Sequence, residues 1–167
     1  PIQLANATAA LANGGDLHRP RLLRRIQRLP DGVVAEPRSP LHRHIDITQR
    51  GYMEAVVAGM VNVVHSAYGT ARSVGAEAAY RIAGKTGTAQ VFGLKQDESY
   101  NAAEIEKRLH DHALFVAFAP SEDPLIAVAV IVENGGSGGR VAGPIAREIM
   151  DAYLVEGGAL ERMGASP

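Results

Sequence analysis

Residues 113–133 read Ala-Leu-Phe-Val-Ala-Phe-Ala-Pro-Ser-Glu-Asp-Pro-Leu-Ile-Ala-Val-Ala-Val-Ile-Val-Glu, and this stretch decides the fold class of the chain. Two apolar runs, residues 113–119 and 125–133, are joined by a turn-rich link of hairpin length. The second run is almost continuously apolar, which predicts a strand that is covered on both faces. Residues 80–90 are β-compatible at their start, so we expect three antiparallel strands in this half of the chain.

Helical patterns surround this strand group. Residues 2–12 carry apolar side chains at nearly helical spacing, and the Asn-Gly-Gly that follows supplies the left-handed positions that end a helix. A second helix, capped by Asp46 or Thr48, is predicted next. Its apolar positions repeat every three or four residues: Tyr52, Val56, Met60, Val63 and Val64. Residues 145–155 again read as helical, so the chain is predicted to be an α+β protein, an antiparallel sheet flanked by helices.

The remaining segments are less regular. Residues 17–29 mix apolar and arginine side chains, as an exposed two-stranded ribbon does. Residues 30–40 contain three prolines and an Asp-Gly pair, which predict turn and loop. Residues 102–109 are charged and favour a helix, and the Gly-Gly-Ser-Gly-Gly of residues 135–139 predicts a flexible loop.

The composition excludes several classes of protein. The chain has 167 residues and a net charge of −1, which argues against a general binder of nucleic acid. The absence of cysteine excludes a disulfide scaffold and a thiolate zinc site. The longest apolar run, residues 125–132, is far shorter than the roughly 20 residues of a membrane helix. Because the chain opens at Pro1 without Met, we expect it to be a piece of a longer protein.

Residues 84–88, Gly-Lys-Thr-Gly-Thr, have three interpretations. A phosphate-binding loop needs a further glycine where this chain has Ala79, so that pattern fails. The second interpretation is a glycine-rich hairpin strand with an exposed lysine. The third is the Lys-Thr-Gly signature of penicilloyl-serine transferases. The five residues alone leave the last two open.

The surrounding residues favour the third interpretation. They are residues 83–94, Pro1-Ile2-Gln3-Leu4, Tyr100-Asn101-Ala102, Asp111-His112, Phe118-Ala119-Pro120 and Glu133-Asn134-Gly135-Gly136. In this order, over nearly the whole chain, they resemble the penicillin-binding protein 2 family, the elongation-type class B peptidoglycan D,D-transpeptidases of bacterial cell-wall synthesis.

The resemblance implies part of a transpeptidase domain with the penicillin-binding protein and serine β-lactamase-like fold, at the periplasmic face of the inner membrane. In that family a serine is acylated by the D-Ala-D-Ala end of a peptidoglycan stem peptide, and an amine of a neighbouring stem takes the acyl group. β-Lactams acylate the same serine, and no metal or organic cofactor is needed. The implied partners are stem peptide, β-lactams, the remaining half of the domain and a cell-elongation glycosyltransferase complex, without nucleic acid.

The resemblance also implies roles for four residues of the Lys-Thr-Gly strand. Lys85 and Thr88 are expected to be catalytic, because Lys85 places a positive charge beside the substrate carboxylate and the Thr88 backbone N–H forms half of the oxyanion hole. Thr86 and Thr88 are two residues apart on a strand, so both hydroxyls can face one side and bind that carboxylate. Gly87 leaves room for an extended peptide along the strand edge.

Two further motifs of the family are missing. No serine of the chain is followed three residues later by the lysine of a Ser-x-x-Lys nucleophile motif. Ser99-Tyr100-Asn101 matches Ser-x-Asn, but it follows the Lys-Thr-Gly strand instead of preceding it, so we interpret the match as coincidence. We therefore expect residues 1–167 to be the C-terminal portion of a single transpeptidase domain, inactive without the nucleophile-bearing half. The alternative is a non-catalytic periplasmic binding module of the same fold.

Three other clusters have structural explanations. His42, His44 and the His-Asp-His of residues 110–112 suggest metal ligands, but without a recognisable third ligand we predict hydrogen-bonded or surface histidines and no metal site. An early group of arginines suits either an anionic glycan or lipid headgroup or, by default, a solvated ribbon face. Its members are Arg19, Arg21, Arg24, Arg25, Arg28, Arg38, Arg43 and Arg50. Residues 69–71, Gly-Thr-Ala, resemble a family segment near the cleft and are given no chemistry.

Overall fold

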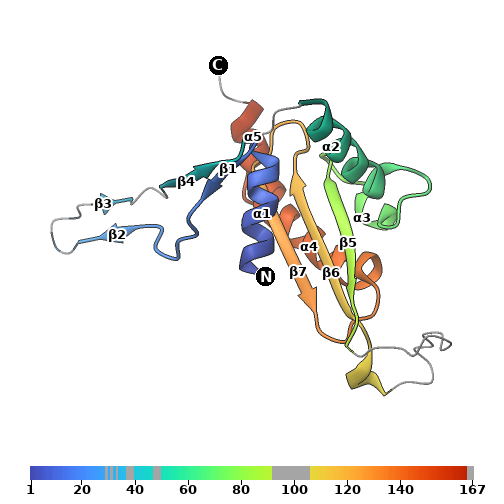
Figure 1. The fold of residues 1–167 in the computed structure, drawn as a ribbon. Coiled ribbons are helices and arrows are strands. Elements are labelled where there is room, and N and C mark those ends of the chain that lie inside the picture. The colour runs from blue at the N-terminus through green and yellow to red at the C-terminus, as the bar shows by residue number, and fades with distance from the viewer. Residues whose placement is uncertain are drawn as a thin grey trace.

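The computed structural model describes residues 1–28, 30, 32, 34–36, 40–46, 50–91 and 106–164. Its centre is an antiparallel sheet of three strands, β5 (Ala83–Ala89), β6 (His112–Ala119) and β7 (Ile126–Val132), in the order β5-β6-β7 (Figure 1). The register pairs Thr86 with Phe115 and Phe115 with Val130. The three-stranded group predicted from the apolar runs is confirmed.

Helices precede and follow this sheet. The α-helices are α1 (Ile2–Ala12), α2 (Arg50–His65), α3 (Arg72–Gly75), α4 (Gly143–Asp151) and α5 (Ala159–Gly164). Two π-helical turns, η2 (Gly138–Ala142) and η3 (Ala152–Glu156), flank α4, and a 3₁₀ turn, η1 (Lys107–Leu109), precedes β6. The helices predicted at residues 2–12 and 145–155 are confirmed.

Each face of the sheet is covered by its own helices (Figure 1). On one face, Phe115 of β6 is fully buried in a cluster with Met150 of α4. On the other face, Phe118 is buried with Met60 of α2, and Leu11 of α1 packs against them. Strand β7 contacts both α1 and α4, which explains why its sequence is apolar at every position.

An arm of paired short strands extends from the domain (Figure 1). Strand β1 (Asp16–His18) pairs with β4 (Leu41–His44), and β2 (Ile26–Gln27) pairs with β3 (Val34–Ala35). A ribbon is confirmed, but residues 17–29 supply only one of its two sides. The other side consists of β3, which lies within the segment 30–40 predicted as loop, and β4, which follows that segment. The turn that joins the two sides contains Gly32 at a φ of +69°, a conformation that glycine adopts without steric cost.

The second predicted helix is confirmed as α2. Residues 47–49 lie outside the described residues, so its predicted cap, Asp46 or Thr48, stays a prediction. Of its apolar positions, Tyr52 and Val56 are 67% and 49% exposed in this chain. Of the helix predicted at residues 102–109, only the turn η1 lies within the described part of the chain.

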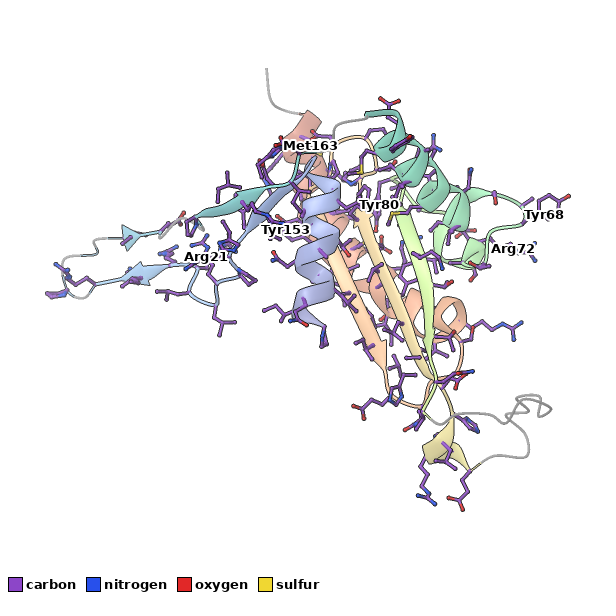
Figure 2. The ribbon with its side chains drawn as sticks, viewed as in Figure 1. Arg21, Tyr68, Arg72, Tyr80, Tyr153 and Met163 are labelled. Carbon is purple, nitrogen blue, oxygen red and sulfur yellow. The ribbon has the colours of Figure 1, made fainter. Side chains whose placement is uncertain are left out.

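A hydrogen-bonded cluster joins α4 to the segment that leads into β5. Arg147 Nε donates to both carboxylate oxygens of Asp151, at 2.9 and 2.7 Å. Arg147 Nη1 donates to the carbonyls of Val74 at 2.8 Å and Ala76 at 3.1 Å. The Tyr80 hydroxyl donates to Asp151 Oδ1 at 2.6 Å, and Figure 2 shows Tyr80 inside the domain. Burial acts to raise the pKa of Asp151, but the bonds from Arg147 and Tyr80 outweigh it and lower this pKa.

The Tyr80→Phe variant of the complete protein is expected to unfold at a lower temperature. Removing one hydrogen bond to a half-buried carboxylate costs about 1–2 kcal/mol, which corresponds to a fall in Tm of roughly 2–8 °C for a domain of this size. Scanning calorimetry measures this change. The matched control is Tyr68→Phe, whose side chain is 97% exposed in the loop between α2 and α3, and an equal fall in both variants would contradict the role given to the Tyr80 hydroxyl.

A second charged contact lies at the base of the arm. Strand pairing sets Asp16 opposite His44, and His44 Nδ1 lies 2.6 Å from Asp16 Oδ1. The hydrogen bond to Asp16 raises the pKa of His44 above its ordinary value, the small loss of solvent opposes this, and Asp46, at 3.7 Å from Nε2, adds to the rise. Because the folded-state pKa is the higher one, the ion pair stabilises the arm fully below about pH 6.5 and is lost as the pH rises through the folded-state pKa.

Titration of the His44 ring by NMR is expected to report this contact. Asp16→Asn removes the principal cause and is expected to return the midpoint toward the ordinary value of about 6.5. Asp46→Asn, which removes the longer contact, is expected to lower the midpoint less. If Asp46→Asn had the larger effect, the assigned cause would be wrong.

Candidate functional site

Strand β5, which carries the Lys-Thr-Gly motif, lies at one edge of the sheet. Within the described residues it pairs only with β6, so its other edge is unpaired. Lys85 and Thr88 are exposed along this strand, and Thr86 and Gly87 are half-buried. An unpaired strand edge presents main-chain donors and acceptors to an extended peptide.

Lys85 enters a groove on one side of the sheet. The groove has a volume of about 610 Å³ and lies between α1 and α2, over β5 and β6. Its lining is Leu4, Ala7, Thr8, Leu11, Val56, Gly59, Met60, Val63, Lys85 and Val116. Among these described residues Lys85 carries the one charge, and its Nζ donates to the carbonyl of Thr86 at 2.6 Å. The site therefore has an ammonium group beside the strand backbone in otherwise apolar surroundings.

Thr86 lies on the opposite face of the strand, as strand alternation requires. Its Oγ1 is 3.3 Å from Oγ1 of Thr70, in the loop between α2 and α3. The Lys85 and Thr86 side chains thus lie on opposite faces of β5. Thr88, two residues on, is exposed.

The glycine segment after β7 is only partly the loop that its composition predicts, because residues 135–137 are irregular and residues 138–139 begin η2. Gly138 and Gly139 are buried at the start of η2, directly against β5. A Cβ at Gly138 would lie 2.6 Å from the Gly87 carbonyl oxygen and closer still to the Leu114 carbonyl, and one at Gly139 would meet the Thr70 carbonyl. Two successive residues without side chains therefore let the η2 backbone approach the motif strand.

Gly87 has a packing role in addition to the one expected for it. A Cβ at Gly87 would lie 3.1 Å from Cβ of Leu114 on the neighbouring strand, which is tighter than ordinary contact. The sheet itself therefore leaves little room for a side chain at Gly87. Its predicted role in peptide binding stays a prediction.

His112, one of the histidines predicted to be surface or hydrogen-bonded residues, has a hydrogen-bond partner. His112 Nδ1 accepts the backbone N–H of Asn134 at 3.0 Å, and Asn134 Nδ2 donates to the carbonyls of Arg108 and His110 at 2.9 Å. These bonds join the end of β7 to the start of β6. In the described part of the chain, no three His, Cys, Asp or Glu side chains come together as a metal site. The Ser99-Tyr100-Asn101 segment lies outside the described residues.

Thr70 and the Gly138–Gly139 pair are the residues at the motif strand that sequence reasoning missed. The signal for the glycines was their position just before a helix that begins with Gly-Pro, which makes them part of a packed helix start. For Thr70 the signal was the likeness of residues 69–71 to a segment near the cleft. Neither signal identifies the strand that these residues contact.

The sequence and fold define the class of protein. The family described as the penicillin binding protein transpeptidase domain matches residues 1–151, and the chain belongs to this family. The chain is 47% identical over 156 residues to the peptidoglycan D,D-transpeptidase MrdA of Haemophilus influenzae, a match covering 92% of this chain and 23% of that protein. It is 44% identical over 155 residues to MrdA of Escherichia coli K12, covering 93% of this chain and 24% of that one.

Solved structures agree with this assignment. The chain superposes on Pseudomonas aeruginosa PBP2, crystallised in complex with WCK 5153, with a TM-score of 0.73 and 44% identity over 93% of this chain and 30% of that chain. It superposes on PBP2 from a Helicobacter pylori complex with MreC with a TM-score of 0.68 and 25% identity, over 91% of this chain and 24% of that chain. The predicted resemblance to PBP2 and the predicted fold class are confirmed.

The chain spans about a quarter of the length of the curated relatives it matches. Across the described residues, none of the helices has the length and apolar character that crossing a bilayer requires.

Because η2 lies so close to β5, adding a side chain at the start of η2 is expected to lower the stability of the domain. Gly138→Ala in the complete protein is expected to force a shift against the Leu114 and Gly87 carbonyls and to cost about 1–3 kcal/mol, measured as a lower Tm. The matched control is Gly51→Ala in α2, where a Cβ meets nothing within 4 Å and alanine favours the helix. A Tm of Gly138→Ala at or above that of the parent would contradict the tight packing.

Proposed function

We propose that this chain is the C-terminal portion of a D,D-transpeptidase domain that cross-links peptidoglycan stem peptides through a serine acyl-enzyme. The supporting observation is the unpaired edge of β5, where an ammonium group and two hydroxyl-bearing residues lie along one exposed strand. The family to which the chain belongs and the names of its MrdA relatives support the same reaction class.

In this proposal the strand binds the carboxylate end of the substrate. A D-Ala-D-Ala peptide lies along the free edge of β5 as an added strand. Its main-chain hydrogen bonds to β5 fix its position along the strand. The Lys85 ammonium attracts the terminal carboxylate, and the Thr86 and Thr88 hydroxyls donate to it. The apolar lining of the groove strengthens the attraction, because it lowers the local dielectric.

The reaction itself needs a serine from the remaining half of the domain. Its oxygen attacks the carbonyl between the two D-alanines, the terminal D-alanine leaves with a proton, and an ester to serine remains. An amine of a second stem peptide then attacks this ester, forms the cross-link and releases the serine. The backbone N–H of Thr88 is proposed to donate to the oxyanion in both steps, a contact whose loss typically costs roughly 10²–10³ in rate.

Three surfaces of the chain suit contact with the remaining half of the domain. The first is the groove between α1 and α2, whose apolar lining surrounds Lys85 and would bring a serine beside it. The second is the outer edge of β7, an apolar strand that pairs with β6 alone among the described strands. The third is a row of exposed apolar side chains along α4 and η3. The row consists of Ile145, Ile149 and Tyr153.

The partners and location follow from the same proposal. The complete protein is expected to act at the periplasmic face of the bacterial inner membrane, with its anchor outside these residues. β-Lactams are expected to acylate its serine, in line with the penicillin G acyl-enzyme complex of penicillin-binding protein A from Mycobacterium tuberculosis. A protein partner is proposed on the model of the Helicobacter pylori complex of PBP2 with MreC. A cell-elongation glycosyltransferase complex is proposed as a further partner from the family resemblance alone.

Labelling of the complete protein with a fluorescent penicillin tests the proposal. Wild-type protein is expected to form a covalent adduct, and Lys85→Ala is expected to form it at least a hundredfold more slowly, because the carboxylate loses its counter-charge. Lys107→Ala, at an exposed lysine of η1, is the matched control and is expected to label normally. Near-normal labelling of Lys85→Ala would remove Lys85 from the site. A wild-type protein that forms no adduct would instead favour the non-catalytic binding module.

A further inference from the structure

The backbone of Thr70 is held in place from two directions. On one side, the Gly69 N–H donates to the Ser66 carbonyl at 3.0 Å and the Ala71 N–H donates to the Val63 carbonyl at 3.0 Å. A Cβ at Gly69 would collide with the carbonyls at the end of α2, and Ala71 is fully buried. The loop therefore has little freedom at this point, even though the Thr70 side chain is exposed.

On the other side, Gly139 of η2 packs against the Thr70 carbonyl, with no space for a side chain between them. The same missing Cβ would also lie 3.3 Å from Cγ2 of Thr86. Thr70, Thr86 and Gly139 thus meet at one point, although they come from three different segments of the chain. This arrangement holds the Thr70 hydroxyl 3.3 Å from that of Thr86.

The direction of this hydrogen bond follows from the chemistry of the proposed ligand. A carboxylate only accepts hydrogen bonds, so Thr86 must donate its proton to bind one. A hydroxyl has a single proton. Because Thr86 uses its proton to bind the carboxylate, its oxygen can only accept a hydrogen bond from Thr70. The Thr70 hydroxyl is then the donor. A chain of two hydrogen bonds runs from the Thr70 hydroxyl through the Thr86 hydroxyl to the carboxylate. Each bond of such a chain strengthens the next.

We propose that Thr70 is a positioning residue, which donates to Thr86 Oγ1 and so directs the Thr86 proton toward the carboxylate of the stem peptide or β-lactam. This inference rests on the proposed function of β5 and adds to it a residue from outside the Lys-Thr-Gly strand. Thr70 itself need not touch the ligand. Tyr68, in the same loop, points away from the domain in Figure 2 and has no part in the contact.

The test compares two substitutions of Thr70 in the complete protein. Thr70→Val keeps the shape but removes the donor, and Thr70→Ser keeps the donor. The probes are a fluorescent penicillin with its free carboxylate and the same penicillin with that carboxylate esterified. The readout is the second-order rate of acylation for each probe, with Tm measured for every variant.

Wild-type protein is expected to prefer the free acid. Thr70→Val is expected to slow acylation by the acid roughly tenfold, while the ester reacts at the wild-type rate, so the preference for the acid shrinks. Thr70→Ser is expected to stay within about threefold of wild type for both probes. Ser73→Ala, which removes an exposed hydroxyl from the neighbouring helix α3, is the matched control and is expected to react as wild type.

Three results would overturn the inference. They are an unchanged acid rate in Thr70→Val, an equal loss for acid and ester together with a lower Tm, and a failure of Thr70→Ser to retain the rate. A wild-type protein that neither probe acylates is a different result: it rejects the proposed function and this inference with it. Acylated wild type with an unaffected Thr70→Val rejects the inference alone.

Discussion

The unpaired edge of β5 is useful only because the rest of the strand is held firmly. Strand β5 pairs with β6 along its whole length, from Ala83 to Ala89. The face that carries Thr86 is covered at Gly138 and Gly139, where the η2 backbone approaches without side chains. Since an extended peptide binds a strand edge by main-chain hydrogen bonds, the position of the β5 backbone sets the position of any ligand. The helix start at η2 is therefore part of the site, although it contributes no functional group.

Most of the fold was predictable from the sequence, because its main elements are specified by local patterns. The apolar runs of β6 and β7 and the helical spacing of residues 2–12 each identify their element without reference to any other. The arm was mispredicted for the opposite reason. Val34 and Ala35 lie in a segment rich in proline, and only their pairing with Ile26 and Gln27 makes them a strand. Strand pairing of this kind depends on register between separate segments, which composition does not encode.

The candidate site likewise has one part that could be predicted from the sequence and one part that could not. The Lys-Thr-Gly motif is contiguous, so the sequence alone pointed to its strand. Thr70 precedes Thr86 by 16 residues, and Gly139 follows it by more than 50, so their meeting exists only in the folded chain. Gly138 and Gly139 were misread because glycine has two opposite uses, flexibility in a loop and close approach in a packed contact. Only the collision that a Cβ would suffer distinguishes the two uses at these positions.

In the proposed function, the charge of Lys85 makes assembly of the domain and binding of a carboxylate depend on each other. In this chain Lys85 is exposed to solvent at the side of an apolar groove. If the remaining half of the domain covers that groove, as proposed, the ammonium loses much of its contact with water. A buried charge without a partner costs several kcal/mol, and a carboxylate at the strand edge offsets that cost. The closed site should therefore bind the carboxylate more tightly than this chain alone, whose solvated lysine interacts with it through a high dielectric. If the proposal holds, the strength with which the groups of β5 bind a carboxylate depends on the half of the domain that excludes water.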